Sequence, residues 1–145
     1  MIEGFRHAGI VVRDLEKTQD FYLKLGFKTQ SQAIETGSFI ESVTGIEDVN
    51  IKWIKMNLPD GNLLELIKYI NPVTEKEIFL QEANQLGVSH LAFNIRNIDL
   101  FCKQVINLGG SIVNSPVLTQ NKQFRVAYCH DVEGNLFEAV ERQYE

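Results

Sequence analysis

Two stretches of the chain, residues 5–12 and 90–95, are short and rich in β-branched and aromatic side chains, which is typical of strands. Each is followed by a segment whose apolar residues recur every three or four positions, the pattern of a helix with one buried face. In the first segment these are Thr18, Phe21, Tyr22 and Leu25, and in the second Ile98, Phe101, Val105 and Leu108. The pattern therefore predicts a strand followed by a helix near the start of each half of the chain.

Capping residues mark both ends of these two helices. Asp14 and Asn97 stand where helix N-caps are expected, because their side-chain oxygens can accept the first free backbone N–H groups. Gly26 and Gly109 stand where the helices should end, since glycine readily adopts the left-handed conformation that closes a helix.

Two predicted hairpins follow the helices. Residues 50–58 lead through the turn 59–62 into 63–69, and residues 124–130 lead through 131–135 into 136–141. We expect residues 31–48 to be irregular with a short helix near 39–43, and residues 74–86 to form a linking helix.

The sequence also repeats itself. Residues 6–15 return as residues 89–98, 83 positions later, so that His7 falls on His90. Residues 61–67 return as 134–140, so that Glu65 falls on Glu138. Each copy thus carries one His near its start and one Glu near its end. We expect an α+β fold built from two βαβββ modules within a single domain: module one at about residues 1–70, a linker at 71–87 and module two at 88–145.

Strand periodicity places the two His side chains on sheet faces that point away from the helices. Glu65 and Glu138 interrupt apolar runs, and a mid-strand carboxylate is costly to bury unless it is paired, protonated or bound to a cation. A single strand His or Glu is usually structural or solvated, and duplication can copy it passively. The recurrence of both residue types in both copies favours a metal site formed by His7, Glu65, His90 and Glu138.

Composition narrows the function classes. The 145 residues suffice for one domain with a hydrophobic core. The net charge of −5 does not favour binding to nucleic acid or to an anionic membrane. No apolar run reaches the roughly 18 residues of a transmembrane helix, and the N-terminus lacks the features of a signal peptide. We expect a soluble cytoplasmic protein that acts on a small molecule, with Cys102 and Cys129 as buried free thiols.

These motifs resemble those of the vicinal oxygen chelate superfamily, which includes glyoxalase I, methylmalonyl-CoA epimerase, extradiol dioxygenases, and fosfomycin and bleomycin resistance proteins. The motifs that carry the resemblance are His7, Val12-Arg13-Asp14-Leu15, Phe21-Tyr22-Leu23-Lys24-Leu25-Gly26-Phe27, Pro59-Asp60-Gly61-Asn62-Leu63-Leu64-Glu65-Leu66, Ser89-His90-Leu91-Ala92-Phe93 and Gly134-Asn135-Leu136-Phe137-Glu138. The resemblance covers essentially the whole chain. It implies paired modules whose mixed sheets curve around a central cavity with one divalent metal, held by His7, Glu65, His90 and Glu138.

The second ligand position distinguishes the subfamilies. The order His, Glu, His, Glu resembles that of glyoxalase I. Methylmalonyl-CoA epimerases usually have Gln in place of Glu65. Ring-cleaving dioxygenases have only three protein ligands, two His and one carboxylate. The resemblance therefore implies a glyoxalase I-like lyase or isomerase as the leading function. An acyl-CoA epimerase is the first alternative, and a non-catalytic binding or resistance protein is the second.

The ligand set suits Ni(II), Co(II), Zn(II) or Mn(II), and the sequence does not choose among them. A metal-held carbonyl favours loss of the neighbouring proton, because the ion stabilises the enediolate that develops. By resemblance we expect Glu138 to be the principal base on a 2-oxo or thiohemiacetal substrate, with Glu65 as its partner. The resemblance also implies a homodimer, and the site can lie within one chain or across two.

Four further features have weaker interpretations. His130 is expected to be a surface or turn residue and not a ligand. Arg125 and Lys122 are candidates to clamp an anionic substrate, although solvated basic residues are the more ordinary interpretation. Residues 39–43 are interpreted either as a lid or as a packed insert.

Overall fold

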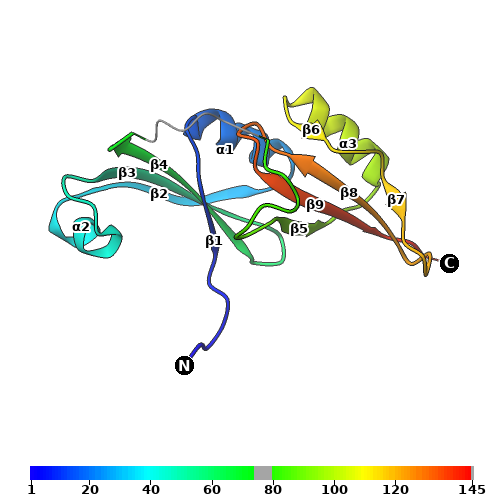
Figure 1. Ribbon diagram of the computed structural model, residues 1–145, viewed down its shortest axis with the longest axis horizontal. Helices are drawn as coiled ribbons and strands as arrows, with labels where there is room; N and C mark the ends of the chain where they lie inside the picture. The colour runs from blue at the N-terminus through cyan, green and yellow to red at the C-terminus, as the bar shows by residue number, and fades with distance from the viewer. Residues whose placement is uncertain (74–79, 145) are drawn as a thin grey trace. The chain divides into compact units, whose positions relative to one another are not determined.

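The computed structural model describes residues 1–73 and 80–144, which form two compact units, Met1–Lys76 and Glu77–Glu145. Both units combine helices with a mixed sheet, so the predicted α+β class is confirmed (Figure 1). The modules at about residues 1–70 and 88–145, with a linker between them, stay a prediction. Their union into one domain around a metal stays a prediction.

The first unit contains a four-stranded sheet in the order β1-β4-β3-β2. Its elements are β1 (Ala8–Val11), α1 (Leu15–Lys24), β2 (Lys28–Thr36), α2 (Ser38–Thr44), β3 (Asn50–Asn57) and β4 (Leu63–Asn71). Strand β1 runs parallel to β4, whereas the β4–β3 and β3–β2 pairs are antiparallel. The parallel pair brings the N-terminal strand beside the strand that carries Glu65.

The second unit repeats this plan, with the order β5-β9-β8-β6 and with β7 paired to β8. Its elements are β5 (Leu91–Asn94), α3 (Ile98–Asn107), β6 (Ser111–Ile112), β7 (Val117–Leu118), β8 (Phe124–His130) and β9 (Leu136–Arg142). Strand β5 is again parallel to β9. The two short strands β6 and β7 stand where the first unit has the single long strand β2.

The predicted helix boundaries are confirmed. The Asp14 carboxylate accepts a hydrogen bond from the Lys17 backbone N–H at 3.0 Å, and the Asn97 side chain accepts one from the Leu100 N–H at 3.1 Å. Gly26 adopts a φ of 108° just after α1, a conformation that glycine reaches without a steric penalty.

Two expectations about the connecting segments were wrong. Residues 31–36 are not irregular but belong to β2, an edge strand whose mostly exposed, polar side chains show no hydrophobic alternation. The expected linking helix is absent from its described part, residues 80–86, while residues 74–79 lie outside the described residues. There the Gln81 N–H donates to the Gly134 carbonyl at 2.9 Å, so this backbone bonds to the β8–β9 turn instead of to itself.

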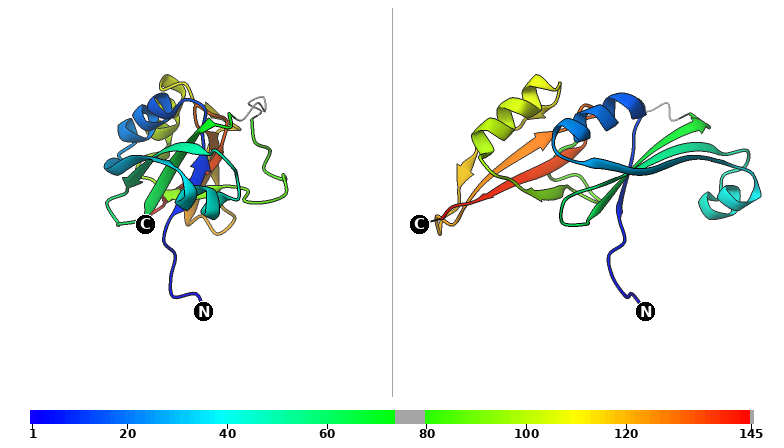
Figure 2. Two further views of the ribbon diagram at one scale, coloured as in Figure 1. Left: turned by 90° about the vertical axis from the view of Figure 1, so that its left-hand side faces the viewer. Right: turned by 180° about the vertical axis from the view of Figure 1, so that it is seen from behind.

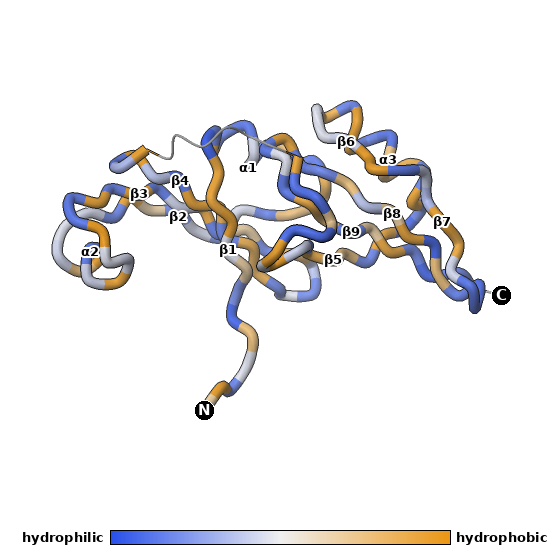
Figure 3. The backbone as a smooth tube through the Cα atoms, viewed as in Figure 1, coloured by the Kyte–Doolittle hydropathy of each residue, from blue (hydrophilic) through white to orange (hydrophobic). Residues whose placement is uncertain are grey.

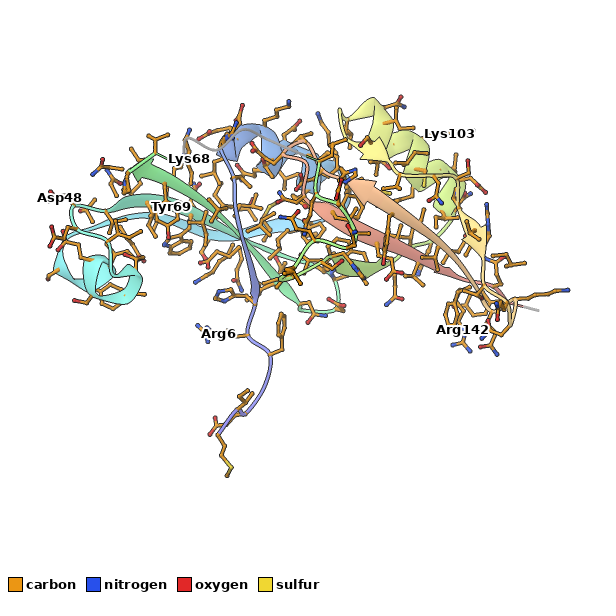
Figure 4. All side chains as sticks on the ribbon, in the orientation of Figure 1. Arg6, Asp48, Lys68, Tyr69, Lys103 and Arg142 are labelled. Carbon is orange, nitrogen blue, oxygen red and sulfur yellow. The ribbon has the colours of Figure 1, made fainter. Side chains whose placement is uncertain are left out.

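The two faces of the first sheet are covered by different helices (Figure 2). Helix α1 packs on the face that carries Leu64 and Leu66 of β4, both buried. Helix α2 lies on the opposite face, where Ile40 forms an apolar cluster with Val49 and Ile51. Trp53, Ile67 and Tyr69 pack against that cluster, and Figure 4 shows Tyr69 on the side of the sheet near α2.

Helix α3 covers one face of the second sheet. Hydrophobic and hydrophilic positions alternate along it, as Figure 3 shows, and Ile98, Cys102 and Val105 are its buried residues. They lie against β8 and β9, whose Cys129 and Phe137 are also buried. Both cysteines are free and buried, as the sequence predicted.

We expect both thiols to resist modification in the native protein. Burial raises the pKa of Cys102, and it raises that of Cys129 to about 12. Because the thiolate is the reactive form, almost none is available at neutral pH. Titration with Ellman's reagent should detect both thiols only after unfolding in guanidinium chloride, and rapid reaction in native buffer would contradict this arrangement.

Candidate metal centre

In the first unit, parallel strand pairing brings His7 and Glu65 together. Gly9 of β1 lies in register with Glu65 of β4, and His7, two positions before Gly9, shares its face of the sheet. His7 Nε2 lies 3.1 Å from Glu65 Oε2. These two residues, 58 positions apart, therefore form a pair on the face opposite α1.

The second unit forms the equivalent pair from His90 and Glu138. Ala92 of β5 is in register with Glu138 of β9, and His90 lies two positions before Ala92. The His90 Nε2 to Glu138 Oε2 distance is 3.5 Å. His90 Nδ1 also lies 3.1 Å from Ser89 Oγ, a contact that orients the ring.

Both pairs are partly enclosed. The side chains of Glu65 and Glu138 are 13% and 23% exposed, and those of His7 and His90 are 27% and 28% exposed. The predicted orientation of the two His side chains, on sheet faces that point away from the helices, is confirmed. The neighbouring positions of β1 and β5 alternate between half-buried and exposed residues, as that orientation requires. Each pair is thus sheltered enough to limit water yet open enough to receive a ligand.

The strand on the other side of each Glu differs between the units. Lys55 of β3 is in register with Glu65, and Tyr128 of β8 is in register with Glu138. Lys55 Nζ lies 3.4 Å from Glu65 Oε1, whereas the Tyr128 ring lies 4.9 Å from the His90 ring, centroid to centroid. Sequence reasoning missed Lys55. The signal was available, since the offset that places Glu65 on Glu138 also places Lys55 on Tyr128.

The donor set of each pair fits part of a divalent metal site. Two ligands bound about 2.1 Å from one ion and at right angles are about 3 Å apart, close to both observed His–Glu distances. His7 Nδ1 is buried without a hydrogen-bond partner among the described residues, so this imidazole has unused bonding capacity. Within each unit, the described residues bring no third His, Cys, Asp or Glu to the pair. Each unit therefore provides one nitrogen and one oxygen donor, half of the predicted ligand set.

His130 differs from the sequence expectation. It is 7% exposed at the end of β8, so the interpretation as a surface residue was wrong. Its Nε2 lies 2.9 Å from the Gln81 carbonyl oxygen and its Nδ1 lies 3.3 Å from Ser111 Oγ. The backbone around Gln81 covers this strand end, a long-range contact that local sequence does not indicate. These contacts hold His130 within the second unit, and the expectation that it is not a ligand stays a prediction.

We expect His130→Ala to destabilise the protein without changing its metal content. The substitution leaves a partly buried carbonyl and hydroxyl without their partner, and the loss of such hydrogen bonds typically costs about 1 kcal/mol each. Guanidinium chloride unfolding measures the loss, and metal analysis of the folded variant provides the second readout. An unchanged free energy of unfolding would show that these contacts contribute little.

Within the second unit, the candidate anion clamps have other partners or surroundings than the His90–Glu138 pair. The Arg125 guanidinium binds both Asp99 carboxylate oxygens, at 2.6 and 2.8 Å, and it points to the α3 side of the sheet. That pairing lowers the pKa of Asp99. Lys122 is exposed in the turn before β8. Residues 39–43 lie in α2, and the buried Ile40 supports the packed-insert interpretation.

Comparison with known proteins agrees with this architecture. The family model of the Glyoxalase/Bleomycin resistance protein/Dioxygenase superfamily matches residues 4–139. The chain therefore belongs to this superfamily, as its sequence motifs predicted. A comparison with curated proteins gave no match.

Solved structures show the same fold. A glyoxalase family protein from Bacillus cereus is 25% identical, with a TM-score of 0.92, and the match covers 99% of this chain and 97% of the other. A fosfomycin resistance protein from Listeria monocytogenes, solved with Mn(II) and a dihydroxypropylphosphonic acid, is 20% identical, with a TM-score of 0.63 and coverage of 96% and 90%. Among the described residues, no helix has the length and apolar character needed to span a membrane.

Proposed function

We propose that this protein is a divalent-metal-dependent, glyoxalase I-like lyase or isomerase that moves a proton on the carbon next to a carbonyl group. The single observation that supports this function is the repeated His–Glu pair. It occupies the same register position on matching strands of both units, with separations of 3.1 and 3.5 Å. A four-ligand ion needs two such pairs, and each unit provides one of them.

In this proposal His7, Glu65, His90 and Glu138 together hold one ion of the Ni(II), Co(II), Zn(II) or Mn(II) class. The two pairs meet either within one chain or across a homodimer. A bound divalent ion supplies Lewis-acid polarisation of the substrate carbonyl. The substrate is a small 2-oxo compound or a thiohemiacetal.

Glu138 acts as the principal base in this proposal, and Glu65 is its partner. Each carboxylate is partly shielded from water, which favours proton transfer from a bound substrate over exchange with solvent. The environments of the two carboxylates are unequal. Glu65 has the Lys55 ammonium beside it, whereas Glu138 has the neutral Tyr128 as its cross-strand neighbour. Glu138 is therefore less restrained by a fixed positive charge.

Metal analysis followed by an exchange assay tests the proposal. Protein stripped with a chelator is reloaded with each of the four ions. It is then incubated in heavy water with hemithioacetals and with 2-substituted acyl-CoA thioesters, and deuterium uptake is followed by NMR. We expect one ion per chain and metal-dependent exchange on a hemithioacetal. Exchange on acyl-CoA thioesters alone would indicate the epimerase alternative, and metal-free, inactive protein would indicate a binding protein.

A further inference from the structure

Lys55 is held firmly beside the first His–Glu pair. Its side chain is 23% exposed, and its ammonium group lies 3.4 Å from Glu65 Oε1 and 4.4 Å from the centroid of the Trp53 ring. Trp53 in turn packs against the apolar cluster that α2 forms with the sheet. The position of this positive charge is therefore set by the fold, through a chain of contacts from α2 to Glu65.

The contacts of Lys55 leave it with capacity for a further partner. An ammonium group has three N–H donors, and the distance to Glu65 is longer than the 2.7–2.9 Å of a strong charge-assisted hydrogen bond. Glu65 is also shared with His7, which lies against its other oxygen. One shared carboxylate is a weak counter-charge for a lysine that is three-quarters buried.

A charge count points to the missing partner. In the proposed centre, the carboxylates of Glu65 and Glu138 balance the two charges of a divalent ion, and both imidazoles are neutral. Lys55 then leaves one positive charge in excess. Tyr128, which occupies the equivalent position in the second unit, adds no charge. A ligand with a single negative charge would restore neutrality.

We propose that Lys55 is a specificity-determining residue that binds a carboxylate group of the substrate. The inference rests on the proposed function and narrows it: the substrate is a monoanion, with its carboxylate on the Lys55 side and its reacting carbonyl at the ion. The Trp53 ring beside Lys55 forms an apolar wall that limits the water competing for the ammonium group.

The competing explanation is that Lys55 only positions Glu65. A positioning role changes the affinity for the ion but treats all substrates alike, whereas a recognition role discriminates between charged and neutral ligands. Two probes separate these roles. Hydroxyacetone and 5-hydroxy-4-oxopentanoate both offer an ion the same neutral pair of a carbonyl and a neighbouring hydroxyl oxygen, but only the second carries a carboxylate. The ratio of their dissociation constants reports recognition, largely independently of how tightly the ion is held.

Isothermal titration of the Mn(II)-loaded full chain measures this ratio. We expect the wild-type protein to bind the carboxylate-bearing probe about tenfold more tightly, the effect of one charge-assisted contact. Lys55→Met should reduce the ratio to about one, and Lys55→Arg should retain part of it. Lys52→Met is the matched control, because Lys52 is on the same strand but pairs with Glu16 at 2.8 Å on the α1 side.

Each outcome decides the question. Equal binding of the two probes by the wild-type protein overturns the inference without any variant. The same holds if Lys55→Met keeps the preference, even when its Mn(II) affinity changes. If Lys55→Met does not fold, Lys55→Gln replaces it, because its shorter polar side chain leaves the packing around Trp53 less disturbed. Failure of the wild-type chain to bind Mn(II) moves the titration to the Ni(II)-, Co(II)- or Zn(II)-loaded protein, and failure to bind any of the four ions would overturn the proposed function and this inference with it.

Discussion

Replacing Glu138 with Gln should abolish α-proton exchange while most of the bound metal remains. The Gln side chain keeps an oxygen that can bind a metal at the same position on β9, where the native Glu138 Oε2 lies 3.5 Å from His90 Nε2. The amide, however, cannot accept the substrate proton. A positioned general base contributes about 10²- to 10⁴-fold to the rate, so a loss of that size is expected. Deuterium uptake in heavy water measures the rate, and Mn(II) titration measures the remaining affinity.

Glu141→Gln provides the control for this change. Glu141 is on the same strand and is partly buried, but it is in register with Arg125 and lies 3.7 Å from its guanidinium group on the α3 side of the sheet. This control should keep full exchange activity. Undiminished turnover in Glu138→Gln would remove Glu138 from the mechanism and leave Glu65 as the candidate base.

Removing both imidazoles should eliminate metal binding. His7→Ala and His90→Ala each delete one of the four proposed ligands, and each should weaken binding by more than the roughly 10- to 100-fold lost with an outer-shell partner. The double variant should bind no ion at stoichiometric concentration. Thermal unfolding with and without Mn(II) is the measurement, because an ion that binds only the folded state raises the melting temperature.

The control here is His130→Ala, which removes an imidazole that contacts Gln81 and Ser111 instead of a carboxylate. It should be less stable than the wild type but should still gain stability when Mn(II) is added. A double variant that keeps the full Mn(II)-dependent shift would show that the ion binds elsewhere or that the shift is nonspecific.

The sequence predicted most of the elements because their signals are local. Caps at Asp14 and Asn97, the apolar faces of α1 and α3, and the two hairpins are all encoded within a few residues. The βαβββ pattern anticipated a strand after the first helix, but residues 31–36 were expected to be irregular because an exposed edge strand carries no hydrophobic alternation. The sequence placed a helix over residues 80–86 because the contacts of Gln81 with the β8–β9 turn come from residues more than 50 positions away.

The sequence predicted which four residues of the candidate site form its two His–Glu pairs. Internal duplication identified His7, Glu65, His90 and Glu138, and strand pairing brings the two residues of each pair within 3.5 Å. What the sequence pattern did not reveal was the difference between the pairs. Lys55 attracts no notice as one of two lysines among the apolar residues of β3, and its importance depends on the cross-strand register that puts it against Glu65.

That difference has a consequence for how duplicated proteins evolve. Two separate, identical subunits must present the same side chain beside both carboxylates, and such a centre treats the two ends of a ligand alike. Fusing the copies into one polypeptide frees each to mutate alone, and the equivalent register positions of the two units now hold Lys55 in one and Tyr128 in the other. In the proposed four-ligand centre, this inequivalence would let a ligand with distinct ends be held in a single orientation, so that one enantiomer is favoured.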